Sequence, residues 1–337
     1  MAGHRDKLSG PRLRFFHPAT FNLLTDNGIT GAGFPVPAYV AALLMGLVGR
    51  DAPGLMRAVT LAFSLGGLLA LFGLVRRASG SAFKGAVAAL FAFCSPIYVF
   101  YQANFLPSVP GFAAALVGYY WFYRTLAEAN APPTTRRHLA AAVAWLTLAA
   151  AMRTPFVLPL LCTLGHLAVL RPRRTAAEVG WRAVGLLYGA AFLVLGADFL
   201  YNEYLSHAYH GSMFLARPRA FSSWAQAMEV TKTVREYWLW SLLSKPQWLL
   251  FCAAAGTMAV QQRRALLQSS WAGHWLALVA GGLAYYGLMG QQYAIHDYYL
   301  LDTFFLPLVL GFGGSLAVLR LACSSRYGWR WPWPCSW

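Results

Sequence analysis

Long apolar stretches separated by short groups of arginine and lysine make up most of this chain. Residues 58–75 form an uninterrupted apolar run that ends at Arg76 and Arg77, which predicts a transmembrane helix. Residues 85–123 carry no charged side chain and suffice for two spans, with a break near the prolines and amides of 101–110. The other apolar segments are 33–49, 138–152, 154–170, 183–197, 246–260, 272–289 and 303–319. This pattern predicts an all-α polytopic transmembrane helix bundle with about nine to ten apolar segments.

Polar residues divide the chain into three regions. Residues 1–33 form a polar N-terminal loop segment, residues 34–320 the transmembrane domain, and residues 321–337 a basic and aromatic C-terminal tail. Residues 203–235 are the longest polar insertion in the transmembrane domain. A long loop in a compact protein is often functional. We expect this one to lie outside the cytoplasm, on the same face as the candidate site residues described below.

Arg153 and Pro155 separate the apolar pieces 138–152 and 154–170. Each piece is shorter than the ~20 residues of a full span, which favours a broken helix or a short hairpin. A cation beside broken helices can bind a phosphate, so Arg153 is a candidate substrate-binding residue. A side chain that merely extends to the membrane interface is an equally good interpretation.

The composition identifies an integral membrane protein. Of 337 residues, 58% are hydrophobic and 11% are charged, whereas about 25% are charged in soluble domains. The net charge of +16 would fit a nucleic-acid partner, but the basic residues form short clusters between apolar runs, as in cytoplasmic loops. We therefore expect membrane lipids and no nucleic acid as partners. The five cysteines show no paired spacing and imply neither a disulfide framework nor a zinc site.

The basic clusters also predict an orientation. Those that we place in the cytoplasm are 76–84, 124–137, 171–182, 261–264 and 320–330. If 138–170 is a hairpin, the polar segments 102–108, 203–235 and 291–299 then meet on the opposite face. We expect a multi-pass protein of the bacterial inner (plasma) membrane.

Residues 290–302 concentrate polar chemistry between two apolar segments. Ionisable groups at the edge of a span usually mark a functional surface or cavity. His296 and Asp297 are candidate catalytic residues that can move a proton or bind a sugar hydroxyl, and Tyr298 and Tyr299 are candidate substrate-binding residues. At helical spacing Tyr299 shares a face with His296 and with Asp302. The alternative is an interfacial tyrosine belt with a helix-capping aspartate.

Three other groups are weaker candidates. Glu203, His207 and His210 have the spacing of a metal cluster, but a solvated loop is the better interpretation, and no residue is assigned as a metal ligand. Asp198, near the end of its span, fits a site carboxylate or a hydrated side chain equally well. The sequence contains no phosphate-binding loop, nucleophile elbow, metalloprotease helix or dinucleotide fingerprint.

Four passages of the chain recur in one known pattern: Arg14–Pro18 with Gly33–Leu44, Tyr101–Pro110, Met152–Pro155, and His296–Tyr299 ahead of Pro307. Together they resemble the polytopic glycosyltransferases of family 39. This family, with the GT-C fold, contains the dolichyl-phosphate-mannose protein mannosyltransferases and the aminoarabinose transferases. The resemblance implies a polyprenyl-phosphate sugar donor, a lipid, glycan or protein acceptor, and inverting transfer outside the cytoplasm. It places Gln102 and Asn104 opposite the 296–299 cluster as substrate-binding residues and implies no certain cofactor, although a divalent metal sometimes steadies the lipid phosphate.

The chain departs from this family at its acidic positions. No hydrophobic span precedes residue 33, so the usual first helix and the acid after it are missing, and we expect a truncated member. Gly33 stands where relatives are often acidic, and the second such position, near Ser108, is uncharged. The remaining candidate for the catalytic acid is Asp26, whose Asn-Gly neighbours suit a turn better than a base.

Two other functions remain open from the sequence. A flippase or transporter of lipid-linked sugars or small solutes predicts paired broken helices in two halves, and one such break is visible, at 153–155. A purely structural membrane subunit would leave residues 290–302 without a role.

Overall fold

The computed structural model describes residues 15–18, 28–31, 33–49, 52–127, 132–211, 217–263 and 269–319. These ranges contain helices and no β-sheet, so the all-α prediction is confirmed for them. The α-helices are α1 (Val36–Val48), α2 (Pro53–Ser79), α3 (Ala82–Phe93), α4 (Pro96–Gln102), α5 (Ser108–Ala127), α6 (Pro132–Met152), α7 (Val157–Gly165), α8 (Pro172–Glu178), α9 (Trp181–Ala208), α10 (Trp224–Thr233), α11 (Leu239–Leu242), α12 (Lys245–Gln261), α14 (Ser270–Leu288), α15 (Tyr298–Leu300) and α16 (Leu306–Val318).

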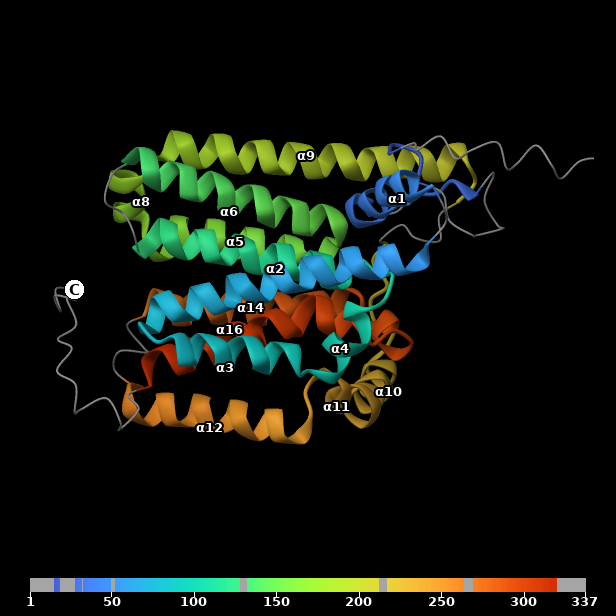
Figure 1. The fold of residues 1–337 in the computed structure, drawn as a ribbon. Coiled ribbons are helices and arrows are strands. Elements are labelled where there is room, and N and C mark those ends of the chain that lie inside the picture. The colour runs from blue at the N-terminus through green and yellow to red at the C-terminus, as the bar shows by residue number, and fades with distance from the viewer. Residues whose placement is uncertain are drawn as a thin grey trace, which may run out of the picture.

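The long helices lie side by side in one bundle (Figure 1). α5 is the buried centre and packs between α2 and α6, while α16 packs against α2, α3 and α12. Small residues permit this close approach. A Cβ at Gly67 would lie 2.7 Å from that of Ala113, and a Cβ at Gly118 would lie 2.7 Å from Leu146 Cγ.

Within the described ranges, three helical segments are long and apolar enough to cross a membrane: Pro53–Ser79, Trp181–Ala208 and Tyr298–Val318. Two bent pairs raise this number to five if each is one span. The multi-pass prediction is thus supported, and α2 contains the predicted span 58–75. The sequence estimate of nine to ten apolar segments is larger, because some apolar helices, such as α1 with 13 residues, are short and others, such as α6 with 21 residues, are not apolar enough to qualify.

The segment around Arg153 is a hairpin. α6 ends at Met152, Arg153 has extended dihedral angles (φ −148°, ψ 115°), and a 3-10 turn over Thr154–Phe156 starts the return. The chain comes back to the beginning of α6, where Arg136 Nε donates to Val179 O at 2.8 Å. The axes of α3 and α4 differ by 75°, a sharp bend that the sequence pattern does not predict. Ser95 caps α4 there, with Pro96 at the first helical position.

The bundle has two chemically different ends. One, which we call the site end, gathers α1, α4, α10, α11 and residues 289–302 (Figure 1). The other, the basic end, carries α8, the C-terminus of α2 and the N-terminus of α6. At this end Lys84 Nζ donates to Leu319 O at 2.5 Å. The predicted meeting of 102–108, 203–235 and 291–299 on one face agrees with this arrangement.

The described part of the N-terminal segment also lies at the site end. Phe34 N donates to Ala151 O at 2.9 Å, and Thr30 Oγ1 donates to Gly211 O at 3.3 Å. α1 is too short to cross the bundle, so the chain reaches α2 without an additional crossing.

Residues 203–235, predicted as a loop, are largely helical. α9 continues to Ala208, and α10 occupies Trp224–Thr233, followed by a π-helical turn over Val234–Trp238. This polar connection between α9 and α12 therefore contains helices of its own, and Phe221 within it packs on Tyr286 of α14.

Candidate functional site

A buried ion pair marks the site end of the bundle. Arg153 Nε donates to Asp302 Oδ2 at 2.9 Å, and Nη2 of the same guanidinium contacts the same oxygen. The Asp302 side chain is fully covered, whereas that of Arg153 is 20% exposed. Ser108 at the start of α5 is buried as well, and among the described residues neither its hydroxyl nor Asp302 Oδ1 has a hydrogen-bond partner. A buried charge of this kind requires an opposite charge and further hydrogen bonds.

Local backbone geometry brings the two partners together. Arg153 occupies the hairpin turn between α6 and α7, which packs on α5: a Cβ at Gly111 would lie 2.8 Å from the Phe156 ring. Asp302 lies in a π-helical turn, Leu301–Phe305, inside the segment that continues into α16. Such single π turns are frequent at functional sites, because they redirect a side chain within a helix.

Tyr298 and Tyr299 cover the Arg153 guanidinium and His296 stacks on Tyr298; we call these three aromatic side chains the aromatic ledge. The Arg153 Cζ atom lies 4.9 Å from the Tyr298 ring centroid and 5.8 Å from that of Tyr299. The two tyrosine rings stack at 5.0 Å, and His296 stacks on Tyr298 at 5.0 Å. The structure therefore brings together Arg153 and three residues predicted from the sequence. Cation–π contacts stabilise such an arrangement.

Asp297 is held by a tyrosine from another helix. The Tyr101 hydroxyl, on α4, donates to Asp297 Oδ1 at 2.5 Å. Asp297 precedes α15 but makes no capping hydrogen bond with its side chain, so the interpretation of a helix-capping aspartate is wrong. Sequence reasoning missed Tyr101 and did not select Asp302 as a site residue. The available signals were an acid inside an apolar segment and a tyrosine next to Gln102.

Gln102 and Asn104 turn toward α2 rather than toward the ledge. Ser64 Oγ donates to Gln102 Oε1 at 3.4 Å, and Thr60 Oγ1 donates to the backbone oxygen of Asn104 at 3.2 Å. Asn104 Oδ1 accepts from the backbone N–H of Phe105. The structure thus places both near the site end, but their hydrogen bonds fix the loop after α4.

The weaker candidates do not join the ledge. Glu203 Oε2 lies 3.6 Å from His207 Nε2 and 3.8 Å from Arg217 Nη2. Within the described ranges no three His, Cys, Asp or Glu side chains could hold a metal ion. Asp198 hydrogen-bonds Asn202 on its own helix, and Asp26 lies outside the described residues.

The electrostatic surroundings favour a neutral His296. Partial burial lowers the pKa of this imidazole, and the Arg153 charge lowers it further, against the opposing effect of Asp297. A neutral imidazole can accept a proton or a hydrogen bond from a hydroxyl group. His296 and Asp297 therefore present two acceptors beside a cation.

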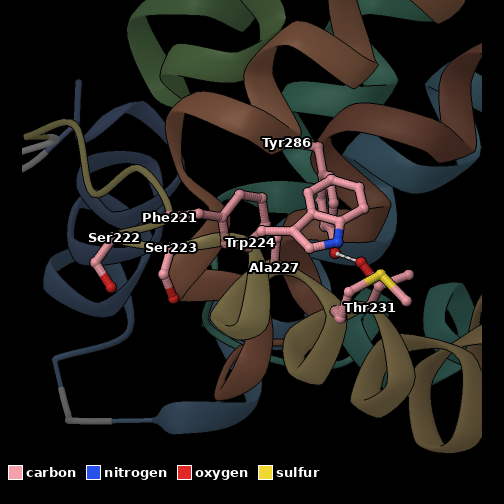
Figure 2. A pocket seen from close by; sticks show the side chains of 8 residues that line it. Phe221, Ser222, Ser223, Trp224, Ala227, Thr231 and Tyr286 are labelled. Carbon is pink, nitrogen blue, oxygen red and sulfur yellow. Dashed lines mark hydrogen bonds between the residues drawn. The ribbon is translucent and has the colours of Figure 1, made fainter.

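A groove of about 530 Å³ lies between α10 and α14, and Tyr286 on its wall contacts Tyr293, whose ring centroid lies 5.4 Å from that of Tyr299 in the ledge. Figure 2 shows its aromatic walls, with Thr231 Oγ1 and the Tyr286 hydroxyl 2.8 Å apart. The groove is lined by Phe221, Ser222, Ser223, Trp224, Ala227, Met228, Thr231 and Tyr286. Arg219 links it to the ledge: its backbone pairs with Leu288 and Gln291, and its charge acts on Tyr299.

The site end thus combines a covered ion pair, stacked aromatic rings, two proton acceptors and an apolar groove. Such a combination suits a ligand with polar, hydroxyl-rich and apolar parts. Comparisons of the chain with protein families, with curated proteins and with solved structures give no match.

Proposed function

We propose that this protein is a membrane glycosyltransferase of the GT-C type. It moves a sugar from a polyprenyl-phosphate-linked donor to a lipid, glycan or protein acceptor on the extracytoplasmic face of the bacterial inner membrane. The observation that supports this proposal is the aromatic ledge stacked over the Arg153–Asp302 pair and flanked by Asp297. Aromatic faces pack on sugar rings, and carboxylates accept hydrogen bonds from sugar hydroxyls.

In this proposal each part of the site has one role. The tyrosines of the ledge contact the sugar, and His296 with Asp297 orients the acceptor and takes its proton. The Arg153 side chain, which is 20% exposed, acts together with Arg219 to stabilise charge on the departing lipid phosphate. The groove beside Tyr286 accommodates the isoprenoid chain. Tyr101 keeps the Asp297 carboxylate in a fixed orientation.

Asp302 has a supporting role in this scheme. The two positions at which relatives carry acids are Gly33 and the vicinity of Ser108, and both lie close to the Arg153 pair. A Cβ at Gly33 would lie 2.5 Å from Met152 O, next to Arg153, and Ser108 begins α5, which packs against both the 154–156 turn and the 301–305 turn. Because the Asp302 side chain is fully covered, it positions Arg153 and does not contact the substrate.

The observation that favoured a transporter was the break at 153–155. Arg153 lies in the turn of a hairpin at the site end, so 153–155 is not a break in the middle of one span. A divalent metal has no cluster of protein ligands among the described residues.

The test is sugar transfer by the purified full chain in proteoliposomes with radiolabelled polyprenyl-phosphate sugars. We expect product with the wild type and a loss of roughly 100-fold or more in Asp297→Asn and His296→Gln. Glu203→Gln and His207→Gln, which also replace a carboxylate and an imidazole at the site end, should retain activity. Absence of product from every donor, with donor binding unaffected by the two site substitutions, would refute the proposal. Movement of intact donor across the bilayer would favour the transporter instead.

A further inference from the structure

Four arginines gather around α8 at the basic end, far from the ledge. α8 leaves the preceding segment Thr154–Leu170 at 97°, and it lies across the end of the bundle beside α6 and α9 (Figure 1). We call these residues the arginine patch: Arg171, Arg173, Arg174 and Arg182. All but Arg171, which is partly buried, are exposed.

The patch is fixed in place by its buried residues. Thr175 is 3% exposed, and its hydroxyl donates to Leu167 O at 2.9 Å. Val179 is also buried, and its carbonyl oxygen accepts from Arg136 Nε. The turn into α9 uses Gly180 at φ +87°, a conformation that favours glycine. The arginines are therefore presented by a docked element.

The patch has an excess of positive charge. Arg171 and Arg174 repel each other, and Glu178 is the acid that acts on Arg171. Within the described ranges no patch arginine has a carboxylate at ion-pair distance. Neighbouring like charges without acidic partners are stabilised by a bound anion.

Exposed apolar side chains border the arginines. Val169 is 75% exposed, Leu170 39% and Trp181 43%. A water-soluble phosphate or a nucleic acid would leave these side chains uncovered. A phospholipid presents a phosphate directly above acyl chains, which matches a row of cations beside apolar and tryptophan side chains.

We infer that the arginine patch binds the phosphate head groups of anionic phospholipids, while Val169, Leu170 and Trp181 contact the upper part of their acyl chains. This inference does not depend on the proposed glycosyl transfer, because it concerns the opposite end of the bundle.

The test compares lipid retention by the full chain in nanodiscs made from equal amounts of phosphatidylcholine and phosphatidylglycerol. Lipids that remain bound after mild detergent extraction are counted by native mass spectrometry. An arginine near an anionic surface contributes roughly fivefold in affinity. We expect the wild type to prefer phosphatidylglycerol and the double variant Arg173→Gln/Arg174→Gln to lose roughly 25-fold of that preference, the product of two such factors.

Two further variants make the result specific. Lys232→Gln/Arg235→Gln removes the same charge at the site end and should retain the preference, as should the charge-preserving Arg173→Lys/Arg174→Lys. All variants should melt like the wild type in pure phosphatidylcholine. Equal retention in wild type and Arg173→Gln/Arg174→Gln, or an equal loss in the site-end control, would overturn the inference. Displacement of the lipid by inorganic phosphate or an oligonucleotide would also overturn it.

Discussion

The Arg153–Asp302 pair joins two residues that are 149 positions apart and closes the polar centre of the site end. Removing one partner of a buried pair leaves the other charge uncompensated, whereas replacing both by apolar side chains is often neutral. Stability therefore requires that the two charges be either paired or both removed, whereas the proposed function requires the Arg153 charge itself.

Single substitutions of this pair should destabilise the protein more than the double substitution. We expect Asp302→Leu and Arg153→Met each to lower the free energy of unfolding by about 3 kcal/mol. The double variant should lose less than either single variant, because no unpaired charge is left. Thermal unfolding of the detergent-solubilised protein measures this. Additive losses would show that the pair does not couple the two positions.

The lowered pKa of His296 predicts a pH dependence of stability. The unfolded chain has an ordinary imidazole pKa of about 6.5, so below that pH the unfolded state binds a proton more readily than the folded state. Stability is thus full above about pH 6.5 and declines as the pH falls toward the lower pKa of the folded state. His296→Gln should reduce the loss in Tm on acidification.

The matched substitution for this measurement is His207→Gln. The His207 side chain is 79% exposed, so this variant should retain the wild-type pH dependence of Tm. An identical decline in wild type and His296→Gln would contradict the assignment.

At the scale of elements, close backbone approaches hold the irregular segments against the bundle. Phe34 N donates to Ala151 O, and Gly33 lies on the backbone of Met152, so the N-terminal segment abuts the hairpin turn that carries Arg153. Gly290 has the same role for the segment before α10, because a Cβ there would lie 2.3 Å from the Phe221 ring. At both positions a Cβ atom would collide with a neighbouring group, so only glycine fits.

Gly33→Ala should therefore disturb the N-terminal segment. Its Cβ would lie 2.5 Å from Met152 O, a backbone atom that cannot move aside easily. We expect a destabilisation of about 1–3 kcal/mol and faster protease cleavage before α1. Gly46→Ala, whose Cβ meets nothing within 4 Å, serves as the control and should be neutral or slightly stabilising. Equal behaviour of the two variants would contradict the packing.

At the scale of the whole molecule, the two ends of the bundle have opposite character. Basic side chains such as Arg76, Arg77 and the arginine patch occupy one end, and the aromatic ledge with Asp297 occupies the other. From the positive-inside rule we predict that the basic end faces the cytoplasm and the site end lies outside it.

Single cysteines at the two ends should react from opposite sides of the membrane. In a cysteine-free background, Trp224→Cys at the site end should react with an impermeant maleimide in intact cells, since Trp224 is 80% exposed. Arg173→Cys at the basic end should react only after permeabilisation. Labelling of both positions from the same side would refute the arrangement.

The sequence by itself determined the helical class, the membrane character, the grouping of polar segments at one end and the ledge residues. It did so because hydropathy and charge act locally: residues 58–75 form a span whatever else surrounds them. Only the tertiary structure decided that Arg153 pairs with Asp302, that Tyr101 holds Asp297, and that Gln102 turns toward Ser64. These contacts join distant positions, and their geometry depends on a hairpin turn and a π-helical turn that no local pattern specifies. The same holds for α10, which packs against the 290–294 turn and hydrogen-bonds through Thr231 to Tyr286 of α14.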